Sequence, residues 1–143
     1  MTNFDTIEDM ALIIIDDYKM MKAYQSDVES FKEYLDGFLI QATMQFYQCR
    51  QDLTYNSTER YFNADLTTLE QSILADFFVI NWWRRETNNA AQIALKLKVS
   101  TAFTFNSESQ NFKEKQTIID KLEEQVNLKI TEYMLQELSN YDY

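Results

Sequence analysis

Histidine and proline are absent from this chain of 143 residues, and glycine and cysteine each occur once. Without histidine, the chain cannot form a Ser-His triad or the Glu-x-x-His pairs of di-iron helical bundles. A single glycine excludes the Gly-rich loops in which a backbone closely approaches a phosphate or a dinucleotide. Because both helix-breaking residues are scarce, long helices are favoured. We therefore expect a helical protein that is not an enzyme and binds no cofactor.

The single cysteine, Cys49, cannot form an internal disulfide. No signal peptide is recognisable at the amino terminus, so we expect a reducing setting, either the cytosol or a particle assembled there. We interpret Cys49 as a small buried side chain, as free cysteines commonly are. The best apolar run, residues 77–83, contains Asn81 and is far shorter than the roughly 18 to 20 residues that span a bilayer, so no membrane partner is expected.

Charge of one sign dominates the composition, with 23 acidic and 13 basic residues and a formal net charge of −10. Affinity for DNA or RNA comes from neutralising phosphates, so this charge argues against ordinary nucleic-acid binding. Residues 1–49 hold nine acids and three lysines, a net of −6, and residues 50–143 hold fourteen acids and ten bases, a net of −4. The amino-terminal third is therefore expected to carry the strongest negative field.

Apolar content is high enough for a real core, since 45% of the residues are hydrophobic and 15% are aromatic. No stretch rich in glycine, serine or proline divides the chain, so we predict a single domain over residues 1–143. The predicted fold is mainly α, a bundle of three to four helices with a long C-terminal helix.

Helical spacing of apolar residues predicts helices over residues 5–18, 27–49, 67–89 and 107–138, with a further helical piece over 90–97. Capping-box spacings mark three of the starts: Ser26 with Glu29, Thr67 with Glu70, and Ser107 with Gln110. The expected inward residues are Ile7, Met10, Ala11, Ile14 and Ile15; Phe31, Leu35, Phe38, Ala42, Phe46 and Cys49; Leu69, Ile73, Phe77, Ile80 and Trp83; and Phe112, Ile119, Leu122, Val126, Ile130 and Tyr133.

Three local features modify this helical picture. Asn88 and Asn89 predict a bend or stop of the third helix. Residues 59–65 and 99–105 alternate loosely and could pair as a short two-stranded β element. Gly37 lies in the middle of a predicted helix, where it costs roughly 1 kcal/mol against alanine, and close approach of a neighbouring helix would explain its presence.

Paired carboxylates near the amino terminus, Glu8 with Asp9 and Asp16 with Asp17, are the first candidate site. They lack the alternating oxygen ligands and the glycine of a calcium loop, and adjacent residues on a helix point in different directions. We therefore expect no metal and interpret these acids as a solvated face.

The run Trp82-Trp83-Arg84-Arg85 is the most unusual local sequence. Adjacent helical residues lie about 100° apart, so one tryptophan should face the core and the other should be exposed beside arginine, as in a subunit contact. The alternative is a broad core that holds both tryptophans, with the arginines paired to local acids such as Glu86. Tyr141 and Tyr143 are a second candidate interface, with a frayed end as the alternative.

The order of features resembles that of the head-tail connector subunits, also called adaptor or head-completion proteins, of tailed bacteriophages, including crAss-like phages. The similarity covers roughly residues 25–143 and rests on spacing. It is carried by Phe31, Leu35, Phe38, Leu39, Thr67, Glu70, Ile73, Leu74, Ala75, Trp82 or Trp83, Asn88, Asn89, Phe103, Ser107 and a long charged helix that ends near Tyr141. The doubled tryptophan and the scarcity of glycine depart from the family pattern.

This resemblance implies a non-enzymatic virion protein in the neck between capsid and tail, assembled in the cytoplasm of the host bacterium. Its partners would be copies of itself in a ring, usually of twelve subunits, the portal protein, and downstream tail or neck proteins. DNA would pass without specific binding, with Glu8, Asp9, Asp16 and Asp17 at an acidic lumen or rim. A different class of function is the alternative: a small acidic inhibitor that mimics DNA and occupies the basic groove of a nuclease or repressor.

Overall fold

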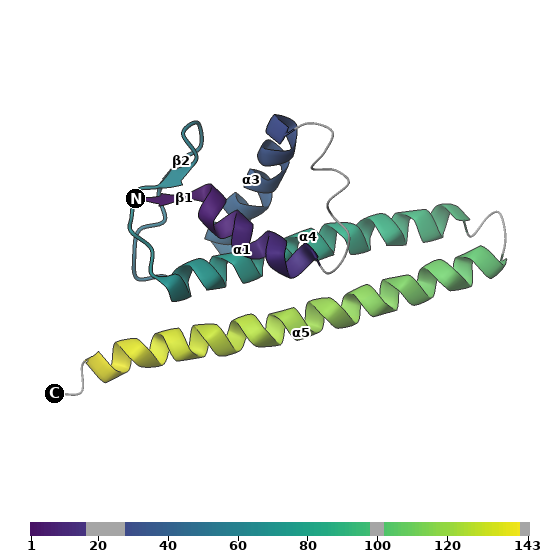
Figure 1. Cartoon of the computed structure of the whole chain (residues 1–143). Coiled ribbons are helices and arrows are strands. Elements are labelled where there is room, and N and C mark those ends of the chain that lie inside the picture. Colours follow the sequence, from purple (N-terminus) through teal and green to yellow (C-terminus); the bar gives the residue numbers. More distant parts are fainter. Residues whose placement is uncertain (17–27, 98–101, 141–143) are drawn as a thin grey trace.

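The computed structural model describes residues 1–16, 28–97 and 102–140 (Figure 1). In these ranges lie the helices α1 (Phe4–Asp16), α3 (Val28–Gln45), α4 (Thr68–Leu97) and α5 (Ala102–Asn140). Three two-residue strands accompany them: β1 (Thr2–Asn3), β2 (Tyr55–Asn56) and β3 (Tyr61–Phe62). The prediction of a mainly helical fold with a long C-terminal helix is confirmed.

Helix α4 is the centre of the arrangement, with α1 and α3 packed on one side and α5 along the other (Figure 1). The two long helices run antiparallel. At 1.5 Å per residue, the 39 residues of α5 extend about 58 Å. Most of the tertiary contact of α5 is with α4, so a large part of its circumference is left outside the bundle.

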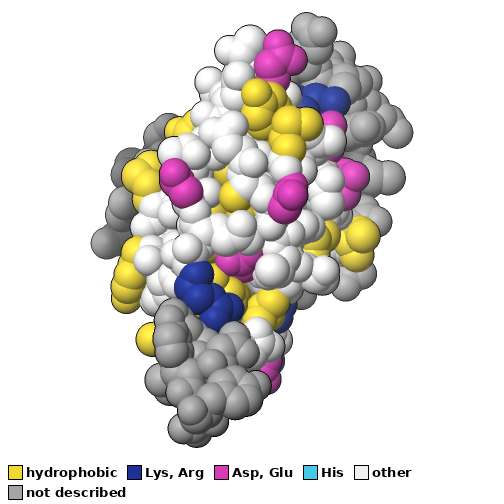
Figure 2. All heavy atoms as spheres, turned by 90° about the vertical axis from the view of Figure 1, so that its left-hand side faces the viewer, with side chains coloured by type: hydrophobic (Ala, Val, Ile, Leu, Met, Phe, Trp, Pro, Cys, Tyr) yellow, Lys and Arg dark blue, Asp and Glu magenta, His cyan; other side chains and the backbone are white. Residues whose placement is uncertain are grey.

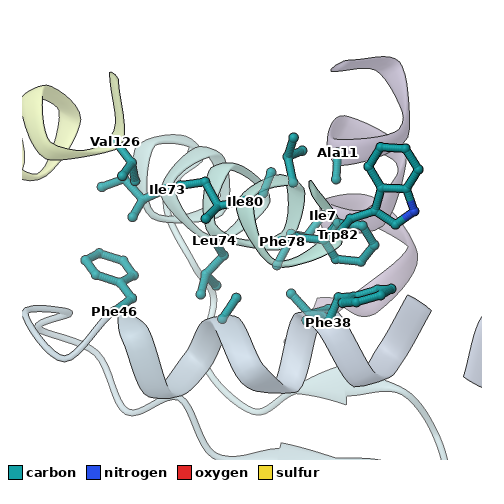
Figure 3. Packing of buried hydrophobic residues seen from close by; sticks show 14 of the residues in the cluster. Ile7, Ala11, Phe38, Phe46, Ile73, Leu74, Phe78, Ile80, Trp82 and Val126 are labelled. Atoms are coloured by element: carbon teal, nitrogen blue, oxygen red, sulfur yellow. The ribbon is translucent and has the colours of Figure 1, made fainter. Parts of the chain in front are cut away.

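The core follows the stripes that apolar spacing predicted. Ile73 and Ile80 of α4 and Val126 of α5 are each at most 2% exposed. In Figure 3, Leu74 and Phe78 point from α4 toward the α3 side, where Phe46 and Phe38 lie, while Val126 meets Ile73 from α5. Burying a side chain of this size contributes about 1.5 to 3 kcal/mol, so this interior is the main source of stability.

Some predicted inward residues fall elsewhere. Ile14 is 37% exposed, and the side chains of Phe31 and Phe112 lie outside the described residues, as does Ser26 of the first capping box.

The capping box at the start of α4 is confirmed. The Thr67 N–H donates to Glu70 Oε1 at 2.8 Å, and the Glu70 N–H donates back to Thr67 Oγ1 at 3.2 Å. The predicted stop at Asn88 and Asn89 is wrong, because α4 continues unbroken to Leu97. Asparagine costs at most about 0.7 kcal/mol relative to alanine in a helix interior, which is too little by itself to end a helix.

The predicted pairing of residues 59–65 with 99–105 is wrong. Residues 102–105 belong to α5, which begins before the predicted cap at Ser107, and residues 99–101 lie outside the described part. The strand in 59–65 shrinks to β3, which is the middle strand of the sheet. It pairs antiparallel with β1, where Thr2 lies opposite Phe62, and with β2, where Tyr55 lies opposite the same residue.

The single glycine, Gly37, lies on the exposed side of α3. A Cβ atom added there would meet no heavy atom within 4 Å, and the residue has no positive φ. The expected close approach of a neighbouring helix is therefore wrong. Gly37 only weakens α3.

Gly37→Ala should therefore stabilise the protein. Alanine fits the helical backbone and restricts the unfolded chain, which should raise the free energy of unfolding by about 0.5 to 1 kcal/mol. Urea denaturation followed by circular dichroism measures the change. A decrease would mean that α3 packs against something at this position.

Candidate protein interface

Both tryptophans of the Trp82-Trp83 pair are buried, at 6% and 5% exposure. Their rings meet edge to face with centroids 4.9 Å apart. Helices lie on more than one side of α4, so two residues 100° apart can both contact a neighbour. In Figure 3, Trp82 lies close to Ala11 of α1. The expected exposed tryptophan is not found, and the alternative of a broad core that holds both is confirmed.

The two arginines that follow are exposed and point to different helices. Arg84 forms an ion pair with Glu123 of α5, and not with the local Glu86 that the sequence suggested. The Arg85 guanidinium lies over the ring of Tyr34 in α3, 5.1 Å from its centroid. These contacts are worth at most about 1 kcal/mol each at the surface, so both arginines stay accessible to a partner.

The four predicted rim acids differ in where they lie. Glu8 is only 2% exposed, so it cannot contribute to a solvated face or a rim, and that prediction is wrong for Glu8. Asp9 is exposed on α1, as expected. Asp16 ends α1 without a described side chain, and Asp17 lies outside the described residues. The predicted interface residues Tyr141 and Tyr143 also lie outside them.

Glu8 is buried because it belongs to a cluster around Arg60. The Arg60 guanidinium donates to both oxygens of Asp36, from Nε to Oδ2 and from Nη2 to Oδ1, each at 2.8 Å. It also donates to Asp5 Oδ1 at 2.7 Å and to Glu8 Oε1 at 2.8 Å. Arg60 has a φ of 60° and is the last residue of the turn between β2 and β3, so one strained residue ties this hairpin to α1 and α3.

Three acidic side chains meet Arg60 in this cluster, and Lys32 also pairs with Asp5, at 3.7 Å. Burial, and then the adjacent carboxyl of Asp36, raise the pKa of Glu8 to about 10, although Arg60 acts against the shift. Glu8 Oε2 has no hydrogen-bond donor among the described residues, so a proton there can be donated toward Asp36. Glu8 therefore carries a proton at neutral pH.

A second polar cluster centres on Glu70 where the loop after α3 meets α4 and α5. Tyr133 Oη donates to Glu70 Oε2 at 2.7 Å and accepts from the Arg50 N–H at 2.8 Å. Gln51 Nε2 donates to Glu70 Oε1 at 2.6 Å. Burial alone would raise the pKa of Glu70, but these donors and the Thr67 N–H outweigh it and lower the pKa. Glu70 is thus an ionised, fully hydrogen-bonded link between three segments.

Cys49 belongs to the same cluster and is partly buried, less completely than the sequence suggested. Its Sγ lies 3.4 Å from Glu70 Oε2. Burial, with the Glu70 carboxylate adding to it, raises the pKa of the Cys49 thiol to about 11. The thiol stays protonated at neutral pH and is a poor nucleophile.

The outer face of α5 carries leucines that the core does not use. Leu128 is 67% exposed and Leu135 is 56% exposed. They are seven positions apart, so they lie on one face of the helix two turns apart, and Thr131 lies between them on that face. We call Leu128, Thr131 and Leu135 the outer stripe of α5. On the end of the molecule shown in Figure 2, apolar side chains are instead scattered among acidic ones.

A pocket of about 240 Å³ lies where the end of α3 meets α4 and α5. Phe77, Ile80 and Val126 give it apolar walls, and the remaining lining residues are Gln45, Arg84, Glu123 and Asn127. A shallower depression of about 310 Å³ adjoins it through Asn127 and reaches Leu128 of the outer stripe. Sequence reasoning found Arg84 here but missed the pocket, because its walls come from three helices.

The described residues contain neither a candidate metal site nor a candidate membrane span. No group of three or more cysteine, aspartate or glutamate side chains there could hold a metal ion. Within the same residues, none of the helices is long and apolar enough to cross a membrane.

Protonation of Glu8 predicts a pH dependence. A pKa raised on folding contributes stability that is full below the unfolded value, 4.5, and is lost as the pH rises toward about 10. Between pH 5 and pH 9, the wild-type chain should therefore lose free energy of unfolding relative to Glu8→Gln, which cannot ionise. Urea titrations at several pH values measure both slopes. Asp9→Asn, an exposed neighbour, should keep the wild-type slope; parallel curves for wild type and Glu8→Gln would contradict a protonated Glu8.

Tyr133→Phe should destabilise the protein, because it removes a hydroxyl group from the Glu70 cluster. The change leaves Glu70 and the Arg50 N–H without their shared partner and should lower the free energy of unfolding by about 1 to 3 kcal/mol. Tyr47→Phe, the same substitution at a side chain 83% exposed, is the matched control and should change little. Equal effects of the two substitutions in urea denaturation would show that the Tyr133 hydroxyl contributes nothing.

Comparison with known proteins gives this chain no family. No protein-family model, no curated protein and no solved structure matches it.

Proposed function

We propose that this chain is a non-enzymatic structural subunit that assembles with copies of itself into a ring between the portal and the tail of a bacteriophage. The proposal starts from the resemblance of residues 25–143 to head-tail connector subunits. The observation that carries it is the outer stripe of α5, an exposed apolar face on a helix about 58 Å long.

A monomer gains nothing from exposing leucines two turns apart on one helix, whereas burial of both in a subunit contact contributes about 1.5 to 3 kcal/mol each. Interfaces of this kind are apolar at the centre and polar at the rim. Glu124 and Glu132 flank the stripe on α5 and are exposed, as is Lys121. The outer stripe thus has the composition of a contact surface, whereas Trp82 and Trp83 belong to the interior.

Exposed acids support the passage of DNA through such a ring without binding. Asp9, Glu33, Asp52 and Glu59 are exposed on the layer formed by α1, α3 and the hairpin. A wall that carries such acids repels phosphates, which is the opposite of a binding groove. Glu8 has no part in this wall, because it is buried and protonated.

Mixing the purified chain with the portal protein encoded in the same genome tests the proposal. Negative-stain microscopy and native mass spectrometry should show rings in which the chain is bound to the portal. Leu128→Gln combined with Leu135→Gln should abolish the rings, since it removes the apolar contact without adding charge. The fold should survive, because exposed substitutions of this kind change stability by at most about 0.5 kcal/mol.

Met44→Gln is the matched control, since Met44 is 72% exposed on α3 and lies outside the outer stripe. Rings should form normally with it. Monomers that bind no portal would contradict the proposal. Binding of a monomer or dimer to a basic nuclease or repressor, with a steep dependence on salt, would instead favour the DNA-mimic inhibitor.

A further inference from the structure

The pocket between α3, α4 and α5 has the size of a site for side chains. Pockets for small-molecule ligands usually hold about 300 to 1,000 Å³, and this one holds about 240 Å³. Phe77 gives it a partly exposed apolar wall, and Ile80 and Val126, each at most 2% exposed, lie beneath, so that one face of an aromatic ring can pack there. At its edge, Arg84 offers a guanidinium that is 49% exposed and has five N–H donors, more than its pairing with Glu123 uses.

Amide groups add hydrogen-bonding capacity to the same pocket. Gln45 Oε1 accepts from Asn81 Nδ2 at 2.7 Å, which turns the Gln45 Nε2 group away from Asn81. Asn127 presents a second amide from α5. An occupant that fits this lining carries an aromatic ring with a polar tip beside a carboxylate.

The segment Tyr141-Asp142-Tyr143 has this chemistry: two phenol rings with a carboxylate between them. We propose that this segment of one copy docks into the pocket of a neighbouring copy, with a tyrosine ring against the apolar walls and Asp142 paired with Arg84. This inference rests on the proposed ring and identifies one of its subunit contacts. Arg84 supplies an opposite charge for the acidic segment, while Glu123, which also lines the pocket and pairs with Arg84, opposes it.

Docking within one chain is excluded by reach. Along α5, Asn127 lies 13 residues before Asn140, a distance of about 20 Å, and the other α5 residues of the pocket lie farther away. Three extended residues span at most about 10 Å. The segment can therefore reach only the pocket of another copy.

Such a contact joins two different surfaces, a pocket and a distant segment, and is heterologous when each copy docks into the next. Repetition of a heterologous contact closes into a ring if the rotation permits and otherwise extends as a filament. Two copies that dock into each other would instead form a closed dimer. A heterologous pocket contact is of the type that the proposed ring requires. The pocket also lies beside the outer stripe, because Asn127 lines both the pocket and the depression that reaches Leu128.

A labelled peptide tests the contact without the portal. A fluorescent peptide with residues 138–143 is titrated into full-length chain in which Tyr141, Asp142 and Tyr143 are serine, and fluorescence anisotropy reports binding. We expect saturable binding that Arg84→Glu weakens at least about tenfold, the loss of one charge-assisted contact. A peptide with Asp142→Lys should recover binding to the Arg84→Glu chain.

Arg85→Glu is the matched control, because it makes the same change of charge one residue away, where the side chain lies over Tyr34 and does not line the pocket. It should change the dissociation constant less than about twofold, a difference below 0.5 kcal/mol. Absence of saturable binding, or equal weakening by Arg84→Glu and Arg85→Glu, overturns the inference. Rings formed with the portal by a chain that fails this test would retain the proposed function and remove only this contact.

Discussion

The interaction on which the rest of the structure depends is that of Arg60 with three acidic side chains. Its side chain binds Asp5 and Glu8 of α1 and both oxygens of Asp36 in α3, and its backbone carbonyl accepts from the Phe4 N–H at 3.0 Å. A β-hairpin far along the chain thus fixes the position of the first helix. The energetic cost of the positive φ of Arg60 is offset by the many contacts that determine its position.

This cluster changes how the acidity of the chain is understood. The amino-terminal third holds nine acids, but Asp5, Glu8 and Asp36 share one arginine from elsewhere in the chain, and Glu8 carries a proton. The described surface of that third is therefore less negative than the composition of that third suggests. Exposed acids are spread over every layer of the described molecule, with Asp9 on α1, Asp52 in a loop and Glu124 on α5. Among the described residues, the exposed acids are therefore not confined to one end of the molecule.

Local signals predicted the parts of the fold that depend on local physics. The Thr67–Glu70 capping box and the apolar stripe of α5 need only residues within a turn or two, and both are confirmed. The failures involve distant partners. Spacing could not show that β1 pairs with β3, or that Glu8 would meet Arg60, because those contacts span more than fifty residues. The tryptophans were misjudged for a related reason, since burial on several sides of α4 is a tertiary property.

The buried tryptophans also decide where an assembly interface can lie. Residues that fill the core of a subunit cannot anchor a neighbour unless the subunit opens, so the contact must use surfaces that folding leaves unpaired. Helix α5 provides these surfaces because it is long and packs mainly on α4. Its inner stripe, Ile119, Val126, Ile130 and Tyr133, stabilises the subunit, while Leu128 and Leu135 on the outer stripe remain exposed. One helix therefore has two apolar faces, and only the inner one is needed for folding. The outer face, next to a pocket edged by Arg84, is where a second copy would gain most by binding.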